Sequence, residues 1–183
     1  MGQDLTVSAG DVLLEDWGEG DRWLLEQTLR DPTQMIHLGG PEDAGKIARR
    51  HRSYLAGNAA RNGRMMRIVR RSDGVSVGTI GFWDREDSAG DGAYETGWHV
   101  LPEFQGRGYA TEATRLTVEL ARADGKWPSI HAYPNVENAA SNRICEKAGF
   151  TLLGPVPIEY PAGHWMTCND WCLDLRQSPA SAP

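Results

Sequence analysis

The segment between residues 93 and 123 most constrains the fold that this chain can adopt, because a turn with two glycines joins a strand-like run to a helix-like run. Gly106 and Gly108 lie in that turn, after the run 93–100 and before the run 111–123. Glycine has no Cβ, so backbone N–H groups can approach a ligand closely. The first helical turn adds unpaired N–H groups and a positive dipole end. This combination predicts a phosphate site, although the two glycines alone are equally compatible with an ordinary connection.

Three stretches of sequence add a resemblance to a known family. The pattern Gln-x-x-Gly-x-Ala at Gln105, Gly108 and Ala110 resembles the acetyl-CoA signature of the GNAT superfamily of N-acetyltransferases. The block 138–150 resembles that family's other segment, and two blocks in the right order are more specific than either alone. The stretch 31–40 resembles the branch that includes ribosomal-protein N-terminal (alanine) acetyltransferases.

The resemblance implies an α/β (α+β) fold with a mixed, mostly antiparallel sheet that is flanked by helices and splayed centrally for acetyl-CoA. It also implies that acetyl-CoA is the cosubstrate and that no metal takes part. The turn would hold the pyrophosphate, and the main chain just before it would pair with the pantetheine arm as an added strand. A plain N-cap role for Asn138 is equally open. The implied cofactor-binding residues are Trp98, His99, Val100, Gln105, Gly106, Arg107, Gly108, Tyr109, Ala110, Thr111 and Asn138.

Length and composition indicate one ordinary globular domain, expected over residues 1–176, with a disordered Ser/Pro/Ala-rich tail at 177–183. The chain has 183 residues, of which 40% are hydrophobic and 24% charged. A net charge of −6 argues against a nucleic-acid partner and favours a cationic one such as an amine. Three cysteines, no membrane-length apolar run and no visible signal peptide predict a cytoplasmic protein. A homodimer is compatible with the sequence, which leaves the oligomeric state open.

Hydrophobic periodicity and turn residues predict the order of elements. Asp31–Pro32 ends the first expected helix, Pro41 begins the second, and Gly57–Asn58 ends it. Strands that form a meander and then alternate with helices are typical of a mixed α/β or α+β layer structure. We expect strands at 5–14, 64–71, 75–83, 93–100, 129–133, 150–153 and 165–175, and helices at 18–29, 41–55, 111–123 and 139–148.

Glu95 is the predicted general base for removing a proton from an ammonium group. It lies on the strand that precedes the glycine turn, and a period of two puts it on the same face as His99. The ordinary pKa of a glutamate, about 4.3, is low for a base, so burial or a water relay would be needed. Tyr94 is a competitor if the faces are shifted by one residue, and Glu95 is also compatible with a purely structural hydrogen-bonding role.

The second block departs from the family pattern at one position. Many relatives carry a tyrosine four residues after the serine as proton donor to the departing thiolate, and here that position is Cys145. The donor is then another group or solvent. Ser141 lies one helical turn before Cys145 on the same face, so Ser141 is the predicted proton donor.

These observations predict an acetyl-CoA-dependent N-acetyltransferase that acts on a primary amine, either a protein N-terminus or a small molecule, by direct attack. The alternative is a non-catalytic acyl-CoA-binding sensor on the same fold. A nucleotide-binding P-loop is disfavoured, because Lys46 in the stretch 40–46 is followed by Ile47 rather than by Ser or Thr. His164, Cys168 and Cys172 recur every four residues, but a zinc site needs a fourth ligand and closer pairs.

Overall fold

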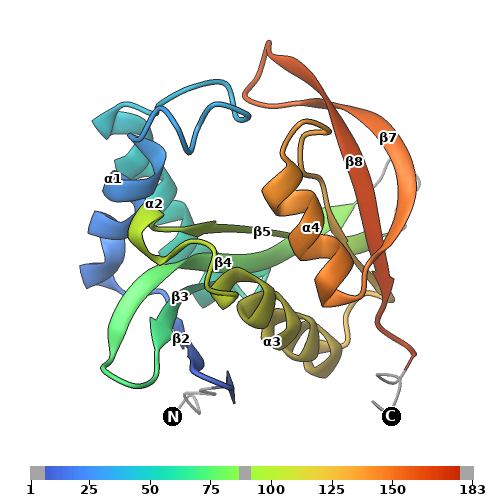
Figure 1. The fold of residues 1–183 in the computed structure, drawn as a ribbon, viewed down its shortest axis with the longest axis horizontal. Helices are drawn as coiled ribbons and strands as arrows, with labels where there is room; N and C mark the ends of the chain where they lie inside the picture. Colours follow the sequence, from blue (N-terminus) through green and yellow to red (C-terminus); the bar gives the residue numbers. More distant parts are fainter. Residues whose placement is uncertain (1–6, 87–91, 178–183) are drawn as a thin grey trace.

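The computed structural model describes residues 7–86 and 92–177 and shows one eight-stranded sheet with helices on both faces (Figure 1). The strand order is β1-β2-β3-β4-β5-β6-β8-β7, and within the described residues only β5 and β6 pair in parallel. The strands are β1 (Val7–Ala9), β2 (Val12–Asp16), β3 (Gly63–Arg70), β4 (Val75–Glu86), β5 (Gly92–Val100), β6 (Ser129–Ala132), β7 (Thr151–Glu159) and β8 (Trp165–Asp174). The α-helices are α1 (Arg22–Leu29), α2 (Ala44–Ala60), α3 (Tyr109–Asp124) and α4 (Ala139–Ala148). The mixed, mostly antiparallel sheet confirms the predicted fold class.

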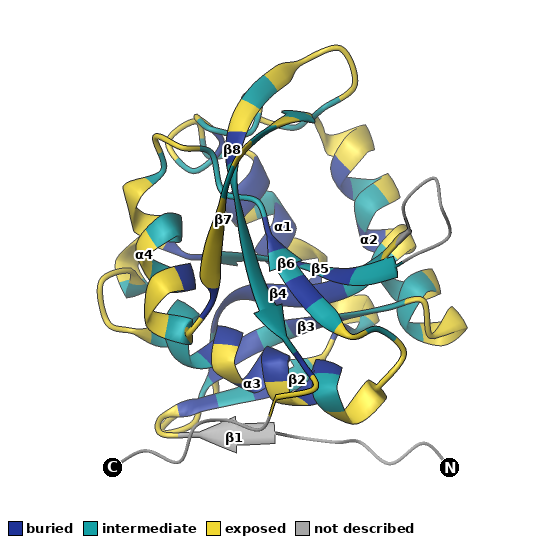
Figure 2. Ribbon diagram, turned by 90° about the vertical axis from the view of Figure 1, so that its right-hand side faces the viewer, coloured by how far each residue is buried: buried dark blue, intermediate teal, exposed yellow. Residues whose placement is uncertain are grey.

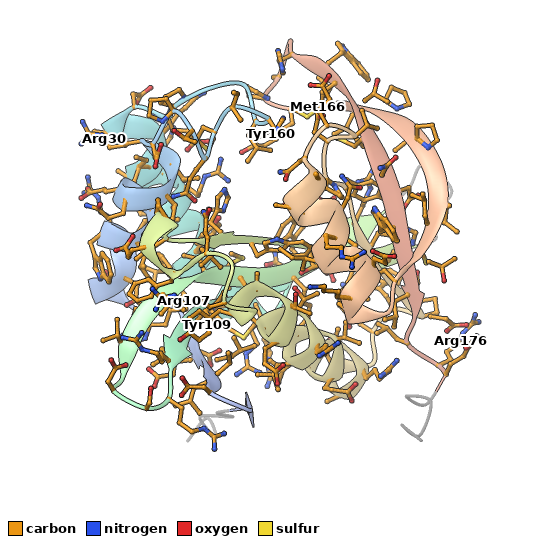
Figure 3. The ribbon with its side chains drawn as sticks, in the orientation of Figure 1. Arg30, Arg107, Tyr109, Tyr160, Met166 and Arg176 are labelled. Atoms are coloured by element: carbon orange, nitrogen blue, oxygen red, sulfur yellow. The ribbon has the colours of Figure 1, made fainter. Side chains whose placement is uncertain are left out.

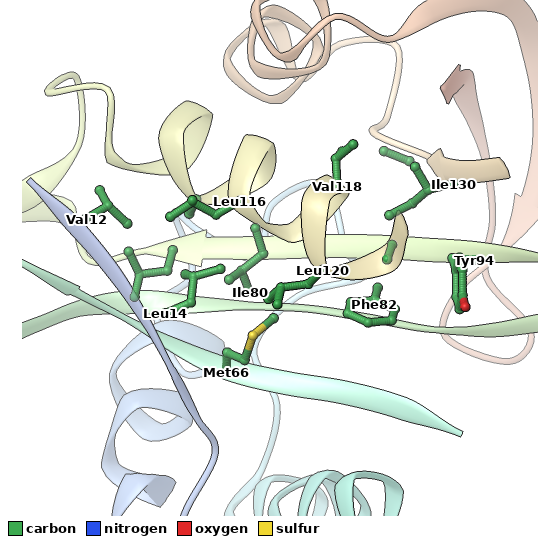
Figure 4. Packing of buried hydrophobic residues seen from close by; sticks show 14 of the residues in the cluster. Val12, Leu14, Met66, Ile80, Phe82, Tyr94, Leu116, Val118, Leu120 and Ile130 are labelled. Carbon is green, nitrogen blue, oxygen red and sulfur yellow. The ribbon is translucent and has the colours of Figure 1, made fainter. Parts of the chain in front are cut away.

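Two apolar cores lie on opposite faces of the sheet. The larger one packs α3 against β2 to β6, with Leu116 and Leu120 over Ile80 and Phe82 (Figure 4). The smaller one packs α1 and α2 on the other face around Trp17, through residues such as Leu24, Leu25 and Ile47. Figure 2 shows the buried residues along the middle of the sheet, with exposed residues on the outer sides of the helices and along β7.

Helix α3 is formed by an apolar stripe that begins directly after the glycine turn. Ala113, Leu116 and Leu120 are buried at spacings of three and four residues, which is the period of one helix face. The helix ends at Gly125, whose left-handed φ of 69° lets its N–H donate to the carbonyl of Ala121. The buried stripe fixes the start of α3, and therefore the turn before it, against the sheet.

Strand β5 is paired very differently along its two edges. Its β4 edge is paired over its whole length, from Val100 opposite Gly78 to Gly92 opposite Glu86. Its β6 edge pairs at only two positions, Tyr94 with Ile130 and Glu95 with His131. The two central strands therefore separate after Glu95, which is the central splay that the family resemblance implies.

The first expected strand, 5–14, is two shorter strands in the described residues, and its first two residues lie outside them. β1 and β2 form an antiparallel hairpin around Gly10, which has a left-handed φ of 53°. The turn was missed because Gly10 is followed by a single polar residue, Asp11, before the apolar alternation resumes. The tail was expected to be disordered from residue 177, and positions 178–183 lie outside the described residues.

Helix α2 begins later and ends later than predicted. Asp43 is its N-cap and accepts a hydrogen bond from the N–H of Lys46, at 2.8 Å, so Pro41 lies before the helix. Asn58 was expected to end the helix, but its side chain bonds both backbone groups of Met65, at 2.9 and 2.7 Å. Those bonds join α2 to β3, and the helix continues to Ala60 before Arg61 adopts a left-handed φ of 58°.

Strand β7 is longer than the expected strand 150–153 because its prolines sit on an edge. Pro155 and Pro157 lie opposite Asn169 and Thr167 of β8, and among the described residues no strand pairs with the other edge of β7. Proline lacks the N–H that a central strand needs but is tolerated in an edge strand. No helix in the described part of the chain is long and apolar enough to span a membrane.

Candidate active site

The glycine turn is exposed and shaped for close approach by a ligand. Gly106 and Gly108 both have left-handed φ angles, 73° and 87°, and a Cβ at either position would meet no protein atom within 4 Å. The first helical bond of α3 runs from Glu112 N–H to the carbonyl of Gly108, at 3.1 Å. The N–H groups of Tyr109, Ala110 and Thr111 therefore precede the helical ladder. This arrangement is compatible with a phosphate group, and the phosphate site stays a prediction.

Cationic side chains flank the turn. The guanidinium groups of Arg70 and Arg107 lie over the ring of Phe104, at 5.1 and 5.8 Å from its centroid. Figure 3 places Arg107 and Tyr109 together at the start of α3. Arg70 is ion-paired with Asp73, so Arg107 is the cation that adds to the positive end of the helix dipole, which favours an anionic ligand.

The open edge of β5 leads from this turn into the molecule. Leu101 donates its N–H to Val77 of β4 at 2.9 Å, and backbone groups alternate in direction along a strand. The main-chain groups of Trp98 and Val100 therefore face away from β4, toward the gap left by β6. The side-chain amide of Gln105 donates to the Val100 carbonyl at 2.9 Å, which ties the turn to the end of the strand.

His99 differs from the two residues beside it. Its carbonyl is so close to Gly78 of β4 that a Cβ added to Gly78 would collide with it, so the His99 backbone faces β4. Of the three strand residues predicted to pair with the cofactor, Trp98 thus presents its main-chain groups to the opening and Val100 its N–H, because the Val100 carbonyl is bonded to Gln105. Burial, followed by the nearby Arg50 cation, lowers the pKa of the His99 side chain to about 4. A neutral imidazole at that position is held on the α2 side of the sheet.

Glu95 lies on the α2 side of β5, where the two central strands separate. Tyr94, next to it, is buried among the α3 core residues, so the predicted alternation of faces is correct. Burial raises the pKa of Glu95, and the Arg85 guanidinium, 2.9 Å from its carboxylate, opposes that rise. The carboxylate is therefore a stronger base than an exposed glutamate but already holds an ion-pair partner.

Tyr94 does not fit the role of competing base. Its hydroxyl donates to Asp124 and accepts from the N–H of Lys126, at 2.9 Å for the second bond. Burial, followed by the hydrogen bond to Asp124, raises its pKa to about 12. A phenol with that pKa, on the α3 face, is a structural group.

A histidine–aspartate pair that the sequence reasoning missed lies beside Glu95. His131 is the register partner of Glu95 on β6, and its Nδ1 lies 2.7 Å from Oδ1 of Asp170. The ring stacks on Tyr133 with a centroid distance of 5.9 Å, and Arg85 lies over the Tyr133 ring at 4.2 Å. No local motif signals this cluster, because β4, β5, β6 and β8 each contribute to it.

Helix α4 begins at its predicted N-cap residue, Asn138. The side chain of Asn138 accepts from the N–H of Ser141 at 3.1 Å, which confirms the N-cap reading, while its cofactor contact stays a prediction. Cys145 is fully buried in the α3 core, and burial raises its pKa to about 12. Ser141, the predicted donor, is only half-buried and so is more accessible than Cys145.

The loop between α1 and α2 meets the β7–β8 turn on the same side of the sheet as Glu95. Arg50 of α2 is ion-paired with Glu42 and donates to the hydroxyl of Tyr160 at 2.6 Å. A Cβ on Gly39 would lie 2.5 Å from the ring of Pro161, so the two segments are in contact. Figure 3 shows Tyr160 between these segments. They form a bridge over the α2 side of the sheet.

Comparison with known sequences gives a family match that covers most of the chain. The family model described as an acetyltransferase (GNAT) domain matches residues 11–151. A Bacillus subtilis (strain 168) protein named uncharacterized N-acetyltransferase YnaD is 27% identical over 120 residues. That alignment spans 66% of this chain and 66% of the relative, just under two thirds of the relative's length.

Solved structures share the fold at low sequence identity. A GNAT-family acetyltransferase from Bacillus anthracis has a TM-score of 0.76 at 20% identity and covers 94% of this chain and 100% of its own. RimL, a ribosomal L7/L12 alpha-N-protein acetyltransferase in complex with coenzyme A, has a TM-score of 0.76 at 16% identity, covering 92% and 97%. Identities this low show the common fold alone.

Proposed function

The chain belongs to the GNAT acetyltransferase family, and we propose that it transfers an acetyl group from acetyl-CoA to a primary amine by direct attack. The single observation that carries the proposal is that the glycine turn and the open edge of β5 are continuous. The exposed turn with Gly106 and Gly108 leads directly to the unpaired β5 edge at Trp98 and Val100. The turn suits a pyrophosphate, and the unpaired edge suits an extended arm that bonds as an added strand.

The residues that would hold the cosubstrate are those of the turn, the first turn of α3 and the open β5 edge. Acetyl-CoA supplies an activated acyl carbonyl and a thiolate leaving group. The N–H of Trp98 faces the opening and is the proposed donor to the thioester oxygen, where negative charge develops. The amide of Gln105 keeps the strand end in place through the Val100 carbonyl. Asn138 is proposed to contact the pantetheine arm while it caps α4.

Glu95 is proposed as the general base that takes a proton from the ammonium form of the acceptor. Its raised pKa brings it nearer to neutral pH, where general bases are most effective. Ser141 is proposed to donate a hydrogen bond to the departing sulfur. A thiolate needs little help near neutral pH because its conjugate acid has a pKa of about 8.5.

The acceptor is proposed to be a small amine or a free protein N-terminus that enters beneath the bridge formed by Arg50 and Tyr160. RimL, a structural neighbour, is described as an alpha-N-protein acetyltransferase, which supports the N-terminal alternative.

The free thiols of Cys145, Cys168 and Cys172 support a cytoplasmic location. The net charge of −6 suits a cationic acceptor, and a homodimer is compatible with this arrangement.

Thiol release from acetyl-CoA tests the proposal. The panel contains short peptides with a free N-terminus, the same peptides N-blocked with one internal lysine, and small polyamines. The proposal predicts amine-dependent thiol release and a product whose mass is increased by one acetyl group. Tight acetyl-CoA binding without release for any amine would instead favour a non-catalytic acyl-CoA sensor, an alternative that the Arg85–Glu95 ion pair also favours.

A further inference from the structure

The side chains around the point where β5 and β6 separate form a charged cluster of which the proposed chemistry uses only Glu95. His131 faces the α2 side of the sheet, since its neighbours Ile130 and Ala132 are buried in the α3 core. Its register partner Glu95 and its hydrogen-bond partner Asp170 lie on that same side. The cluster therefore adjoins the base on the side from which the acceptor is proposed to enter.

The Asp170 contact determines which ring nitrogen of His131 is available. A carboxylate only accepts hydrogen bonds, so Nδ1 of His131 carries a proton and donates it to Asp170 at 2.7 Å. The second nitrogen, Nε2, then keeps its lone pair when the ring is neutral. It lies 3.4 Å from the hydroxyl of Ser129, a long contact that leaves it able to accept a proton.

Charged and aromatic side chains surround His131. Glu95 on β5 and Asp170 on β8 are carboxylates on either side of it, while Arg85 of β4 is ion-paired to Glu95. Tyr133 stacks on its ring, and Cys172 is its register partner on β8. Two carboxylates and one guanidinium therefore lie in the same cluster as the imidazole ring.

We propose that His131, positioned by Asp170, receives the proton that Glu95 takes from the amine and releases it to solvent. This inference rests on the proposed function. The ammonium gives its proton to Glu95, which passes it to Nε2 of His131. The free amine attacks the thioester carbonyl, the C–S bond breaks, and the second amine proton goes to the departing sulfur. The imidazolium then loses its proton to water, and Glu95 is ionised and paired with Arg85 for the next turnover.

Asp170 is a positioning residue in this scheme, because it acts through the ring it orients. Replacing it with asparagine keeps the shape but offers an N–H that can donate to Nδ1. The opposite ring tautomer is then favoured, with the proton on Nε2. Asp170→Asn should therefore reproduce much of the defect of His131→Gln.

The test combines the pH dependence of kcat/KM with a measurement on the chain alone. His131→Gln should lower kcat/KM about tenfold near neutral pH, less than the loss of a full general base, and displace the acidic limb of the profile. Asp170→Asn should do the same, and Glu119→Gln, at an exposed position of α3 on the other side of the sheet, should leave the profile unchanged. The Kd of acetyl-CoA should stay the same in all three variants.

Nitrogen-15 NMR of the imidazole groups, without cosubstrate, gives the second readout. His131 should carry its proton on Nδ1 in the unaltered chain and shift toward Nε2 in Asp170→Asn. A proton on Nε2 in the unaltered chain, or a His131→Gln profile that superimposes on the original, overturns the relay while amine-dependent thiol release still supports the acetyltransferase. Absence of thiol release from the unaltered chain with every amine overturns both.

Discussion

The two edges of β5 show how one strand serves both the fold and the proposed site. Along β4 it is paired from end to end, and the approach is so close that Gly78 has no room for a Cβ beside the His99 carbonyl. Along β6 it is paired at only two positions, and Trp98 and Val100 are left facing the gap. The rigid edge holds the open edge in place without any contact from a ligand. The paired edge thus positions the strand, and the proposed binding of acetyl-CoA uses the other edge.

The comparison predicts the largest effect for a change on the paired edge. Gly78→Val should lower the free energy of unfolding by ~4 kcal/mol or more, because its Cβ would collide with the His99 carbonyl and force β4 and β5 apart. Urea unfolding measures this loss. Gly20→Val is the matched control, since a Cβ at Gly20 meets nothing within 4 Å. Equal stability of the two variants would show that the paired edge tolerates separation.

A change in the glycine turn, which follows the open edge of β5, should have the opposite pattern of effects. It should weaken acetyl-CoA binding strongly and change the free energy of unfolding only slightly. Gly108→Val should weaken acetyl-CoA binding at least ~100-fold, because a side chain there blocks the N–H groups from a phosphate. No protein atom lies near the added Cβ, so the cost to folding is the backbone strain of a left-handed valine, about 1–2 kcal/mol.

Gly149→Val is the control for that strain. Gly149 has a similar φ of 91° at the end of α4, also with nothing within 4 Å of an added Cβ. Isothermal titration calorimetry on both folded variants should find loss of affinity only for Gly108→Val. Equal affinities would remove the turn from the cosubstrate site.

For Glu95, which lies where β5 and β6 separate, the comparison predicts an effect on the chemical step and none on acetyl-CoA binding. Glu95→Gln should lower kcat roughly 100-fold, in line with the loss of a general base, and leave the Kd of acetyl-CoA unchanged. Glu95 must be ionised to act, so the rate should rise with pH through its raised pKa, above the usual glutamate range. Stopped-flow or steady-state kinetics across pH measure this, and a kcat that is unaltered at every pH would assign the proton to water or to His131 directly.

The smallest predicted effect concerns the departing sulfur. Ser141→Ala should lower kcat by roughly tenfold, at or below the low end of general-acid effects. Cys145→Ala should keep a near-normal kcat and lose stability, because Cys145 is buried in the α3 core. The pair of variants is compared by steady-state kinetics and thermal unfolding. A slow Cys145→Ala beside an unaffected Ser141→Ala would reverse the assignment.

The sequence predicted those parts of the molecule whose cause is local. The Gln105–Ala110 turn, the α4 cap at Asn138 and the alternation around Glu95 each depend on residues within about ten positions of one another. The end of α2 was predicted wrongly at Asn58 because the hydrogen-bond partner of its side chain, the backbone of Met65, belongs to the following strand. The strand β7 was predicted to end before Pro155, because an edge position, where proline is tolerated, cannot be recognised before the strand order is known.

The proposed acceptor side depends on partners that are far apart in the chain. Asp170 is 39 residues from His131, and Tyr160 is 110 residues from Arg50. Histidine, aspartate and arginine at those positions carry no periodic or spacing signal of their own, so only the fold brings them together. The glycine turn could therefore be predicted from the sequence, whereas the bridge and the histidine–aspartate pair could not.

Amide hydrogen exchange along β5, followed by NMR with and without acetyl-CoA, tests the central claim most directly. The account predicts that Gly97 and His99, whose N–H groups face β4, are protected in both samples. It predicts that Trp98 and Val100 exchange quickly in the chain alone and become protected when acetyl-CoA is added. Slow exchange of Trp98 and Val100 without acetyl-CoA, or no change on its addition, would contradict the claim that the open edge of β5 is where the cosubstrate binds.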